Sequence, residues 1–323
     1  MSAELIDGNA VAEEIIEKVK ADANEFESRT GRKPLLTAVQ VGENPASRMY
    51  IKMQEKSCND VGIDYNLITL SEDTTEQQLL DEIAKLNSDE SISGLILQMP
   101  LPQEIDARTI QACIAPEKDV EGINPANLGK IFFGQTVPAP CTAVAAADLL
   151  ERTCNDLAGK EAVVIGHSEI VGKPLAAMLL KSPNASPTVT VCHVATRDLA
   201  EHTRRADILI TAAGVSQAKW LHHKRSGSTE TPDLSHLVSG DMIKPGAIVI
   251  DVAINRIPRG FDESGAPLKK ENGKADMMTV GDVDFEAARE IASAITPVPG
   301  GVGPVTVAKL LENTLFCAMA NEN

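Results

Sequence analysis

Tyr50 and Gln54, four residues apart, are the first side chains whose types and spacing could act on a ligand. They lie in SRMYIKMQEK (47–56), predicted here as a helix, and four helical residues advance about 400°, so the two share one face. Lys52 and Lys56 are turned about 200° and 240° from Tyr50 and point elsewhere. A glutamine can hydrogen-bond a ligand or a water, but it has no titratable proton near neutral pH. This face is therefore suited to binding, and Gln54 cannot carry a proton.

A second chemical signal is the glycine turn in AVVIGHSEIVGKPLAAML (162–179). An apolar strand is expected to end at Gly166, and Gly172 is expected to open a helix. Glycine lets the backbone approach a pyrophosphate, whose charge then meets the helix N-terminus. Ser168 replaces the middle glycine of the GxGxxG pattern, so the segment fits a plain strand-to-helix turn about equally well.

The following predicted strand, TVTVCHV (188–194), should end where the adenosine ribose of a dinucleotide would lie. NAD enzymes commonly place an Asp or Glu at this point to hold the 2′-hydroxyl group. Here His193 is followed by three uncharged residues and Arg197, and no carboxylate precedes Asp198. Arg197 could meet a 2′-phosphate, with His167 as the next candidate. The segment favours NADP slightly over NAD.

A third signal is the glycine-proline loop of ITPVPGGVGPVTVAKLLENTLFCAMAN (295–321), which leads into a predicted helix. A helix that begins so soon after GGVGP can aim backbone N–H groups at a ligand. The alternative is a stiff turn before a packing helix.

The elements around these signals alternate between helix and strand. Helical periodicity and short apolar runs predict helices near 8–28, 47–61 and 75–88, and strands at 34–42, 65–70 and 93–100. After PAPCT (138–142), a predicted helix at 143–153 leads into four more short apolar strands. Such alternation is typical of parallel sheets covered by helices. We therefore expect two α/β domains.

The connection 215–245 in the second series is polar and longer than the ~2–6 residues usual between such elements. It is predicted as a surface excursion that contains Trp220, the only tryptophan. His222 and His223 could be ligands there, but solvated loop histidines are the better interpretation.

Composition limits the remaining classes of function. The 323 residues are 43% apolar and carry a net charge of −16, which disfavours a general nucleic-acid or anionic-membrane surface. The six cysteines are scattered, without a CxxC pair or a Cys/His cluster at metal-ligand spacing, so no metal is expected. The N-terminus lacks the features of a signal peptide, and no run reaches the ~18 apolar residues of a membrane span. A cytoplasmic protein is expected.

Six motifs, taken in order, resemble the methylenetetrahydrofolate dehydrogenase/cyclohydrolase family over nearly the whole chain. They are NPASRMY (44–50), LILQMPLP (95–102), PEKDVEGINPANLG (116–129), PAPCT (138–142), IGHSEIVGKP (165–174) and TPVPGGVGPVTVAKLLENT (296–314). The resemblance implies a folate-binding catalytic domain (1–142 and 296–323), completed by the C-terminal helix. It also implies a Rossmann-type NAD(P) domain (143–295), a cleft between the two, and a homodimer.

The resemblance also implies roles for individual residues. Tyr50 matches the tyrosine that stacks on the folate, Gln98 the glutamine that assists a catalytic lysine, and Glu121 an aspartate that grips the pterin ring. Other residues expected at the folate are Ser47, Leu97, Met99, Pro299, Gly303 and Pro304. Those expected at the dinucleotide are Cys141, Gly166, His167, Ser168, Ile170, Val171, Gly172, His193, Arg197, Ala213, Gly214, Ile254 and Thr306.

The chain departs from the family pattern at two of these positions. Gln54 stands where the pattern has the catalytic lysine, and Glu121 carries one methylene more than the usual aspartate. The leading hypothesis is therefore a dehydrogenase that oxidises 5,10-methylenetetrahydrofolate with weak or absent cyclohydrolase activity. The alternative is the full bifunctional enzyme, with Glu121 or an ordered water relaying protons. A non-catalytic folate- or dinucleotide-binding protein is the remote alternative.

Overall fold

The structure is a computed structural model that describes residues 2–135, 138–180, 184–226, 231–263 and 265–322. The chain divides into two compact units. The six-stranded unit comprises Met1–Asn9 and Ala145–Pro304, and the three-stranded unit comprises Ala10–Val144 and Val305–Asn323. Residues 1–9, which the sequence analysis grouped with the folate domain, belong to the six-stranded unit because β1 (Glu4–Leu5) pairs in parallel with β11 (Ala294–Ile295).

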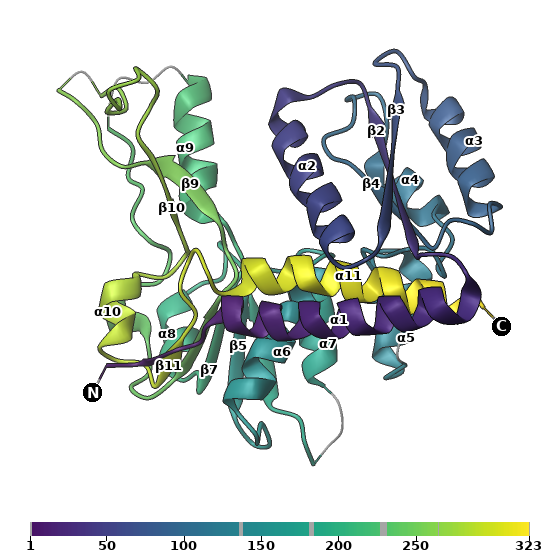
Figure 1. Cartoon of the computed structure of the whole chain (residues 1–323). Coiled ribbons are helices and arrows are strands. Elements are labelled where there is room, and N and C mark those ends of the chain that lie inside the picture. Colours follow the sequence, from purple (N-terminus) through teal and green to yellow (C-terminus); the bar gives the residue numbers. More distant parts are fainter. Residues whose placement is uncertain (1, 136–137, 181–183, 227–230, 264, 323) are drawn as a thin grey trace. The chain divides into compact units, whose positions relative to one another are not determined.

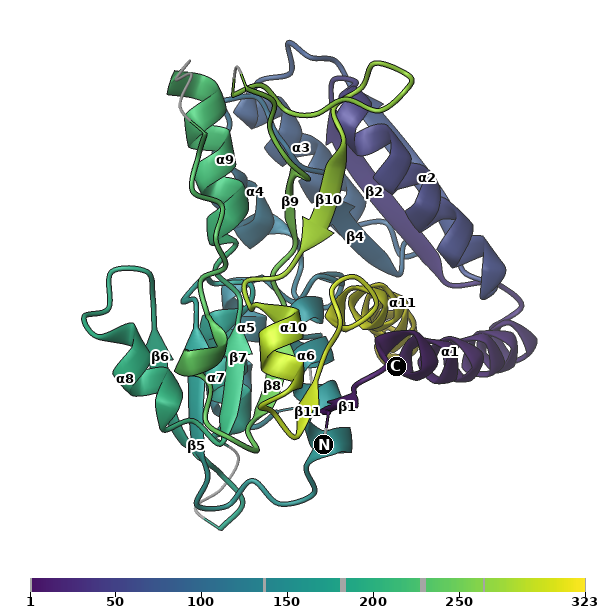
Figure 2. The same ribbon diagram turned by 90° about the vertical axis from the view of Figure 1, so that its left-hand side faces the viewer.

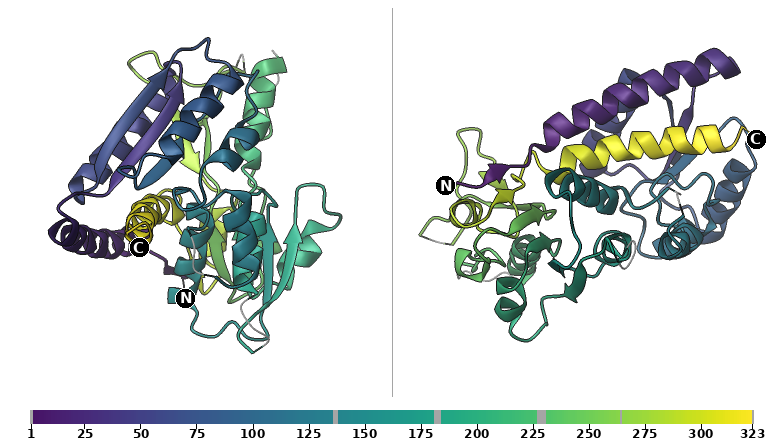
Figure 3. Two further views of the ribbon diagram at one scale, coloured as in Figure 1. Left: turned by 90° about the vertical axis from the view of Figure 1, so that its right-hand side faces the viewer. Right: turned by 90° about the horizontal axis from the view of Figure 1, so that it is seen from below.

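The three-stranded unit is built on a parallel sheet in the order β3-β2-β4. The strands are β2 (Leu35–Val41), β3 (Asp64–Leu70) and β4 (Gly94–Leu97). The helices that lie wholly or partly in this unit are α1 (Gly8–Thr30), α2 (Pro45–Asp60), α3 (Glu76–Asn87), α4 (Ala107–Cys113), α5 (Pro125–Phe132), α6 (Cys141–Thr153) and α11 (Val302–Ala320). The helices α1 and α11 lie side by side although they occupy opposite ends of the chain (Figures 1 and 3).

The two faces of this sheet carry different side chains. One face packs on α3 and α4 through a hydrophobic cluster that includes Val39, Leu79, Ile83, Leu95 and Ile110. The helix α2 lies on the opposite side of the sheet (Figure 1). Alternate strand residues point to opposite faces, so a polar group on β3 or at the end of β4 can face α2 while its neighbours fill the core.

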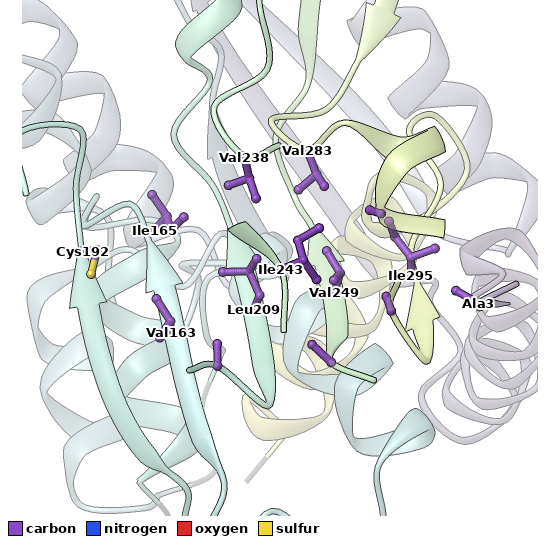
Figure 4. Close-up of a cluster of buried hydrophobic side chains, with 14 residues drawn as sticks. Ala3, Val163, Ile165, Cys192, Leu209, Val238, Ile243, Val249, Val283 and Ile295 are labelled. Atoms are coloured by element: carbon purple, nitrogen blue, oxygen red, sulfur yellow. The ribbon is translucent and has the colours of Figure 1, made fainter. Parts of the chain in front are cut away.

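The six-stranded unit has a parallel sheet in the order β1-β11-β8-β7-β5-β6 (Figure 2). Its longer strands are β5 (Glu161–Ile165), β6 (Thr188–Cys192), β7 (Ile208–Thr211) and β8 (Ile248–Asp251). Buried aliphatic residues of these strands form its core (Figure 4). The helices α7 (Gly172–Leu179), α8 (Leu199–Arg204) and α10 (Phe285–Arg289) connect strands of the sheet, and β9 (Asn255–Pro258) pairs antiparallel with β10 (Met277–Val280).

This strand order creates a ligand-binding position within the six-stranded unit. From β5 the chain passes to β6 on one side, and the next strand, β7, lies on the other side of β5. In such doubly wound sheets, ligands bind beyond the carboxyl ends of the strands at this switch point. Gly166 directly follows β5 and therefore lies there.

The described parts of the polar connection, 215–226 and 231–245, contain the helix α9 (Val215–Ser226) and a 3₁₀ turn at Gly240–Met242, which the sequence analysis did not predict. Trp220 packs against His223, with 5.7 Å between ring centroids, and against Phe261, at 5.8 Å. Among the described residues, no group of three or more His, Cys, Asp or Glu side chains could hold a metal. In the same part of the chain, no helix combines the length and the apolar character that crossing a membrane requires.

Candidate functional site

Tyr50 and Gln54 share a face of α2, as the helical spacing predicts. Tyr50 is 51% exposed, whereas Gln54 is 5% exposed and lies inside the three-stranded unit. The Gln54 Oε1 atom accepts two hydrogen bonds, from the Tyr65 hydroxyl at 2.9 Å and from Gln98 Nε2 at 2.8 Å. The predicted Gln54 and Gln98 are thus in direct contact, and a tyrosine that the sequence analysis did not assign completes the group.

Strand geometry explains how Tyr65 and Gln98 reach the same side chain. Tyr65 is the second residue of β3 and pairs with Leu36 on β2. Gln98 directly follows β4, and its backbone N–H donates to the Val39 carbonyl at 2.8 Å. Tyr65 is half-buried, and the sequence signal that could have identified it is its place at the start of the predicted strand 65–70, because a tyrosine packed against a sheet usually has a hydrogen-bond partner for its hydroxyl. Burial raises the pKa of Tyr65, so its hydroxyl stays a donor.

Glu121 lies on a loop that is held by the residues around it. Asp119 is buried and accepts hydrogen bonds from the Asn124 backbone N–H at 2.7 Å and from Asn127 Nδ2 at 3.1 Å. Gly122 has φ +68° and lies so close to the Ala139 backbone that a Cβ atom would not fit. The sharp turn at glycine therefore fixes the direction in which Glu121 leaves the chain.

The environment of Glu121 makes its carboxyl group suitable for proton transfer. Burial, followed by the negative charge of Asp119, raises its pKa from 4.5 to about 7. Although half of the Tyr50 side chain is exposed, desolvation of its hydroxyl raises its pKa, with smaller contributions from Glu121 and Cys141, so these three side chains interact. A carboxyl group that titrates near neutrality can both accept and donate a proton under working conditions.

Cys141 begins α6 and belongs to the same group as Glu121. Burial raises its thiol pKa, and the thiol donates to the Val120 carbonyl at 3.5 Å. Asn313 Nδ2 of α11 donates to Cys141 Sγ at 3.5 Å, to the Val120 carbonyl at 2.8 Å and to the Ala139 carbonyl at 3.1 Å. A thiol that stays protonated is a poor nucleophile, so Cys141 acts here by packing. Asn313, which the sequence analysis did not single out, ties this loop to α11.

Three residues predicted at the folate differ in accessibility. Met99 is 49% exposed, and Ser47 is half-buried, with its hydroxyl donating to the Asn44 carbonyl at 3.0 Å. Leu97 is 2% exposed and lies in the hydrophobic cluster against α3 and α4. Its side chain therefore cannot line a binding surface on the α2 side, which corrects the expectation for this residue to a backbone contact at most.

The glycine turn of the six-stranded unit has the close backbone packing that the sequence predicts. Gly166 has φ +125°, and a Cβ atom on Gly172 would collide with the Gly166 carbonyl oxygen. Ser168 Oγ accepts the Val171 backbone N–H at 3.2 Å, which closes the loop before α7. Ile170 is 53% exposed at the same turn. Glycine is thus required at both ends of the turn, at the switch point of the sheet.

Ala213 and Gly214 follow β7 and are held by a buried acid. Asp282 accepts the backbone N–H groups of Ala213 at 2.8 Å, Gly214 at 3.0 Å and Val215 at 3.2 Å. It also accepts Asn255 Nδ2 at 3.1 Å. These amides open α9, where a carboxylate is electrostatically favourable. The Ala213 and Gly214 amides are therefore already bonded within the protein, which leaves carbonyl and van der Waals contacts for a ligand. Asp282 is another residue that the sequence analysis did not identify.

The residues expected at the adenosine end lie on two segments, since His167 follows Gly166 in the turn after β5, and His193 and Arg197 follow β6. The imidazole rings of His167 and His193 are edge to face, with 5.1 Å between centroids. His193 Nδ1 accepts the Ala195 backbone N–H at 3.1 Å, and Arg197 is exposed. The structure thus brings His167 and His193 together. A 2′-phosphate contact for Arg197, with His167 as the next candidate, stays a prediction.

The glycine-proline loop lines a cavity of about 360 Å³ within the six-stranded unit. Its lining includes four predicted residues, namely Ile254, Pro299, Gly303 and Pro304. Asp251, which was not predicted, is also in the lining, and burial raises its pKa to about 7. Asp251 accepts four hydrogen bonds, from the Thr211 hydroxyl and from the backbone N–H groups of residues 253, 282 and 283. Thr306 is half-buried on α11, in the three-stranded unit.

Comparisons with known proteins identify two family domains in this chain. The family pattern "Tetrahydrofolate dehydrogenase/cyclohydrolase, catalytic domain" matches residues 6–121. The pattern "Tetrahydrofolate dehydrogenase/cyclohydrolase, NAD(P)-binding domain" matches residues 140–223 and 233–322. A curated relative from Chlorobium phaeovibrioides, named "Bifunctional protein FolD", is 43% identical over 314 residues, which is 96% of each chain.

Solved structures give the same result. The bifunctional enzyme FolD, methylenetetrahydrofolate dehydrogenase/cyclohydrolase, from Campylobacter jejuni has a TM-score of 0.82 and 40% identity over 99% of both chains. The Trypanosoma brucei methylenetetrahydrofolate dehydrogenase-cyclohydrolase, solved with NADP cofactor and an inhibitor, has a TM-score of 0.81 and 35% identity. It covers 99% of this chain and 98% of its own.

Proposed function

The chain belongs to the tetrahydrofolate dehydrogenase/cyclohydrolase family, and we propose that it oxidises 5,10-methylenetetrahydrofolate with NADP⁺ and hydrolyses the methenyl product to 10-formyltetrahydrofolate. Relatives described as bifunctional support this reading over a dehydrogenase without cyclohydrolase activity. The observation that carries the proposal is Glu121, a titratable carboxyl group beside Tyr50 whose pKa is raised to about 7.

Oxidation depends mainly on positioning and on charge. NADP⁺, when bound, supplies the hydride acceptor, and the turn from Gly166 to Gly172 would hold its pyrophosphate. Tyr50 is accessible on α2 and would stack on the folate. Loss of hydride leaves a positive charge on the folate, and an ionised Glu121 would stabilise that charge. No titratable group at position 54 is needed for this step.

Hydrolysis requires a proton carrier, and we assign that role to Glu121. As a carboxylate it would take a proton from the water that adds to the methenyl carbon, and as a carboxylic acid it would return that proton to a ring nitrogen when the carbon–nitrogen bond breaks. The remaining proton of the added hydroxyl leaves to solvent as the formyl carbonyl forms, so hydrolysis releases one proton overall. A pKa near 7 makes both forms available at neutral pH. Gln54 and Gln98 contribute hydrogen bonds only, because a carboxamide does not titrate.

The second candidate function is a dehydrogenase with weak or absent cyclohydrolase activity. Gln54 favours it, because the position that carries the catalytic lysine in the family pattern here holds a buried amide. On this reading Glu121 would only bind the pterin ring. A non-catalytic binding protein is less consistent with the chain, since Tyr50, Gln98 and the glycine-proline loop are all present.

One spectroscopic experiment separates these functions. The purified protein is mixed with 5,10-methylenetetrahydrofolate and NADP⁺ or NAD⁺, and the absorbances of reduced nicotinamide and of the methenyl compound are followed together. Reduced nicotinamide without methenyl accumulation is expected for the bifunctional enzyme. Accumulation of both compounds would refute the cyclohydrolase assignment, and no change in either would refute catalysis altogether.

We also infer a homodimer, on the basis of the family resemblance alone. Light scattering coupled to size-exclusion chromatography should give about twice the 34.4 kDa mass of one chain. A mass of one chain across the working concentration range would refute this inference.

A further inference from the structure

The carboxamide of Gln54 has one satisfied end and one unsatisfied end. Its oxygen accepts from both Tyr65 and Gln98, at 2.9 and 2.8 Å. Its Nε2 atom is buried and has no hydrogen-bond partner among the described residues. The whole residue is only 5% exposed, so bulk water cannot supply the missing hydrogen-bond acceptor for Nε2.

A buried amide N–H without a partner carries a desolvation penalty, and native proteins rarely leave one in place without a reason. Rotating the Gln54 amide by 180° would not remove the problem. The Tyr65 hydroxyl and a rotated Gln98 amide could then accept from Nε2, but Oε1 would take its place as the buried atom without a partner. With the Tyr65 hydroxyl and Gln98 Nε2 as donors, the Gln54 NH₂ group points away from both.

We propose that Tyr65 is a positioning residue which, together with Gln98, holds the Gln54 carboxamide so that its NH₂ group donates to an acceptor atom of the bound folate. This inference rests on the proposed folate substrate. It gives Gln54 a binding role that a glutamine can fill, in place of the proton transfer that it cannot perform.

The position of the group on the fold agrees with this role. Gln54 lies one helical turn after Tyr50, the exposed residue assigned to the folate, and the two share a face of α2. Figure 1 shows α2 on one side of the sheet, and both Tyr65 of β3 and Gln98, which follows β4, donate to Gln54 of α2. Tyr65 therefore reaches the proposed folate contact through its hydrogen bond to Gln54.

The chain offers a matched control for Tyr65. On the same strand pair, Gln40 Nε2 donates to Thr69 Oγ1 at 2.7 Å, so Thr69→Val also removes a β3 hydroxyl that contacts a glutamine. That pair makes no hydrogen bond with Gln54. Tyr65→Phe and Thr69→Val thus remove the same chemical group from the same strand, and only the first changes the Gln54 amide.

The test measures equilibrium binding of 5-formyltetrahydrofolate, a stable folate, so that its result does not depend on turnover. Tyr65→Phe should weaken folate binding by about two- to tenfold, the effect of one lost hydrogen bond, and leave NADP⁺ affinity unchanged. Thr69→Val should change neither affinity. Equal folate affinities in Tyr65→Phe and Thr69→Val, both folded, would overturn the inference, as would equal losses for folate and NADP⁺.

Gln54→Glu provides a second and independent arm. The carboxylate still accepts from Tyr65 and Gln98 but replaces the donating NH₂ by an oxygen, so folate binding should fall by at least tenfold. Wild-type folate affinity in this variant would overturn the inference even if Tyr65→Phe fails to fold. A wild type that binds the folate without turning over methylenetetrahydrofolate would instead refute the proposed function and leave the binding comparison intact.

Discussion

Replacing Glu121 by glutamine removes the one titratable group that the proposed hydrolysis uses. The amide has nearly the same shape as the carboxyl group, so the loop held by Asp119 and Gly122 should keep its form. A positioned acid/base typically contributes ~10²–10⁴-fold, and Glu121→Gln should slow methenyl hydrolysis by a factor in that range. Hydride transfer should fall by less than about tenfold, because it depends on positioning.

The pH dependence gives this prediction a sign. As the base, Glu121 must be ionised, so wild-type hydrolysis should rise with pH through about 7, whereas the variant should be flat there. The same pKa has a consequence for stability. The pKa of Glu121 is raised from 4.5 to about 7 in the folded state. Its contribution to the stability of the fold is therefore fully present below pH 4.5, the pKa in the unfolded state, and is lost as pH rises through the folded-state pKa of about 7.

The size of the stability change follows from the shift. A difference of about 2.5 pH units corresponds to at most about 3 kcal/mol, and partial exposure of Glu121 reduces it. Relative to wild type, Glu121→Gln should therefore gain up to about 3 kcal/mol in unfolding free energy between pH 5 and pH 8. Denaturant titrations at the two pH values measure this difference, and subtracting wild type removes the contribution of Asp251, which has a similar shift.

The assay follows hydride transfer and methenyl decay in parallel for wild type, Glu121→Gln and Glu117→Gln. Glu117 is exposed and lies four residues earlier, so it controls for the loss of one negative charge from this segment. Unchanged hydrolysis in Glu121→Gln, with the pH profile of wild type, would show that the proton travels by another route.

Three further variants test the remaining assignments. Gln54→Lys introduces an amine of lowered pKa beside Gln98. It should raise the rate of methenyl hydrolysis by less than about tenfold if Glu121 already carries the proton. A larger gain in the methenyl-decay assay would favour the dehydrogenase with weak or absent cyclohydrolase activity. Arg197→Ala should weaken the binding of NADP⁺ by about ten- to a hundredfold relative to that of NAD⁺. Equal effects on the two coenzymes would exclude Arg197 from the 2′-phosphate site and make His167 the next candidate. Asp282→Ala leaves three backbone amides without their acceptor and should lower the unfolding free energy by at least about 3 kcal/mol, as measured by chemical denaturation.

Local sequence patterns were sufficient for many elements and for the close turns of this chain, but they missed the helix α9 in the polar connection. The strand before Gly166 and the helix that carries Tyr50 were predicted because periodicity and glycine act over a few residues. The contacts that complete the site join distant positions. Gln54 and Gln98 are 44 residues apart, Asp282 and Ala213 are 69 apart, and Asn313 bonds to Val120 across 193 residues.

These distant contacts depend on the order of the strands in each sheet, and local sequence patterns do not determine that order. Leu97 shows the opposite error. Its motif suggested a folate contact, but alternation along β4 turns its side chain into the core on the α3 and α4 side, while Gln98 faces α2. A shift of one residue along the chain, from Leu97 to Gln98, thus separates a side chain that packs in the core from one that belongs to the candidate site.

Gln54 changes the charge of the site as well as its proton chemistry. Hydride transfer produces a cationic methenyl group, and a lysine at this position would add a like charge close to it. With a neutral amide, an ionised Glu121 faces the developing cation without a competing ammonium, which favours oxidation and retention of the methenyl group. While the methenyl compound stays bound, Glu121 can take a proton from the attacking water. The absence of a lysine is therefore compatible with hydrolysis, because burial raises the pKa of the Glu121 carboxyl group to about 7 and so supplies another group that can carry the proton.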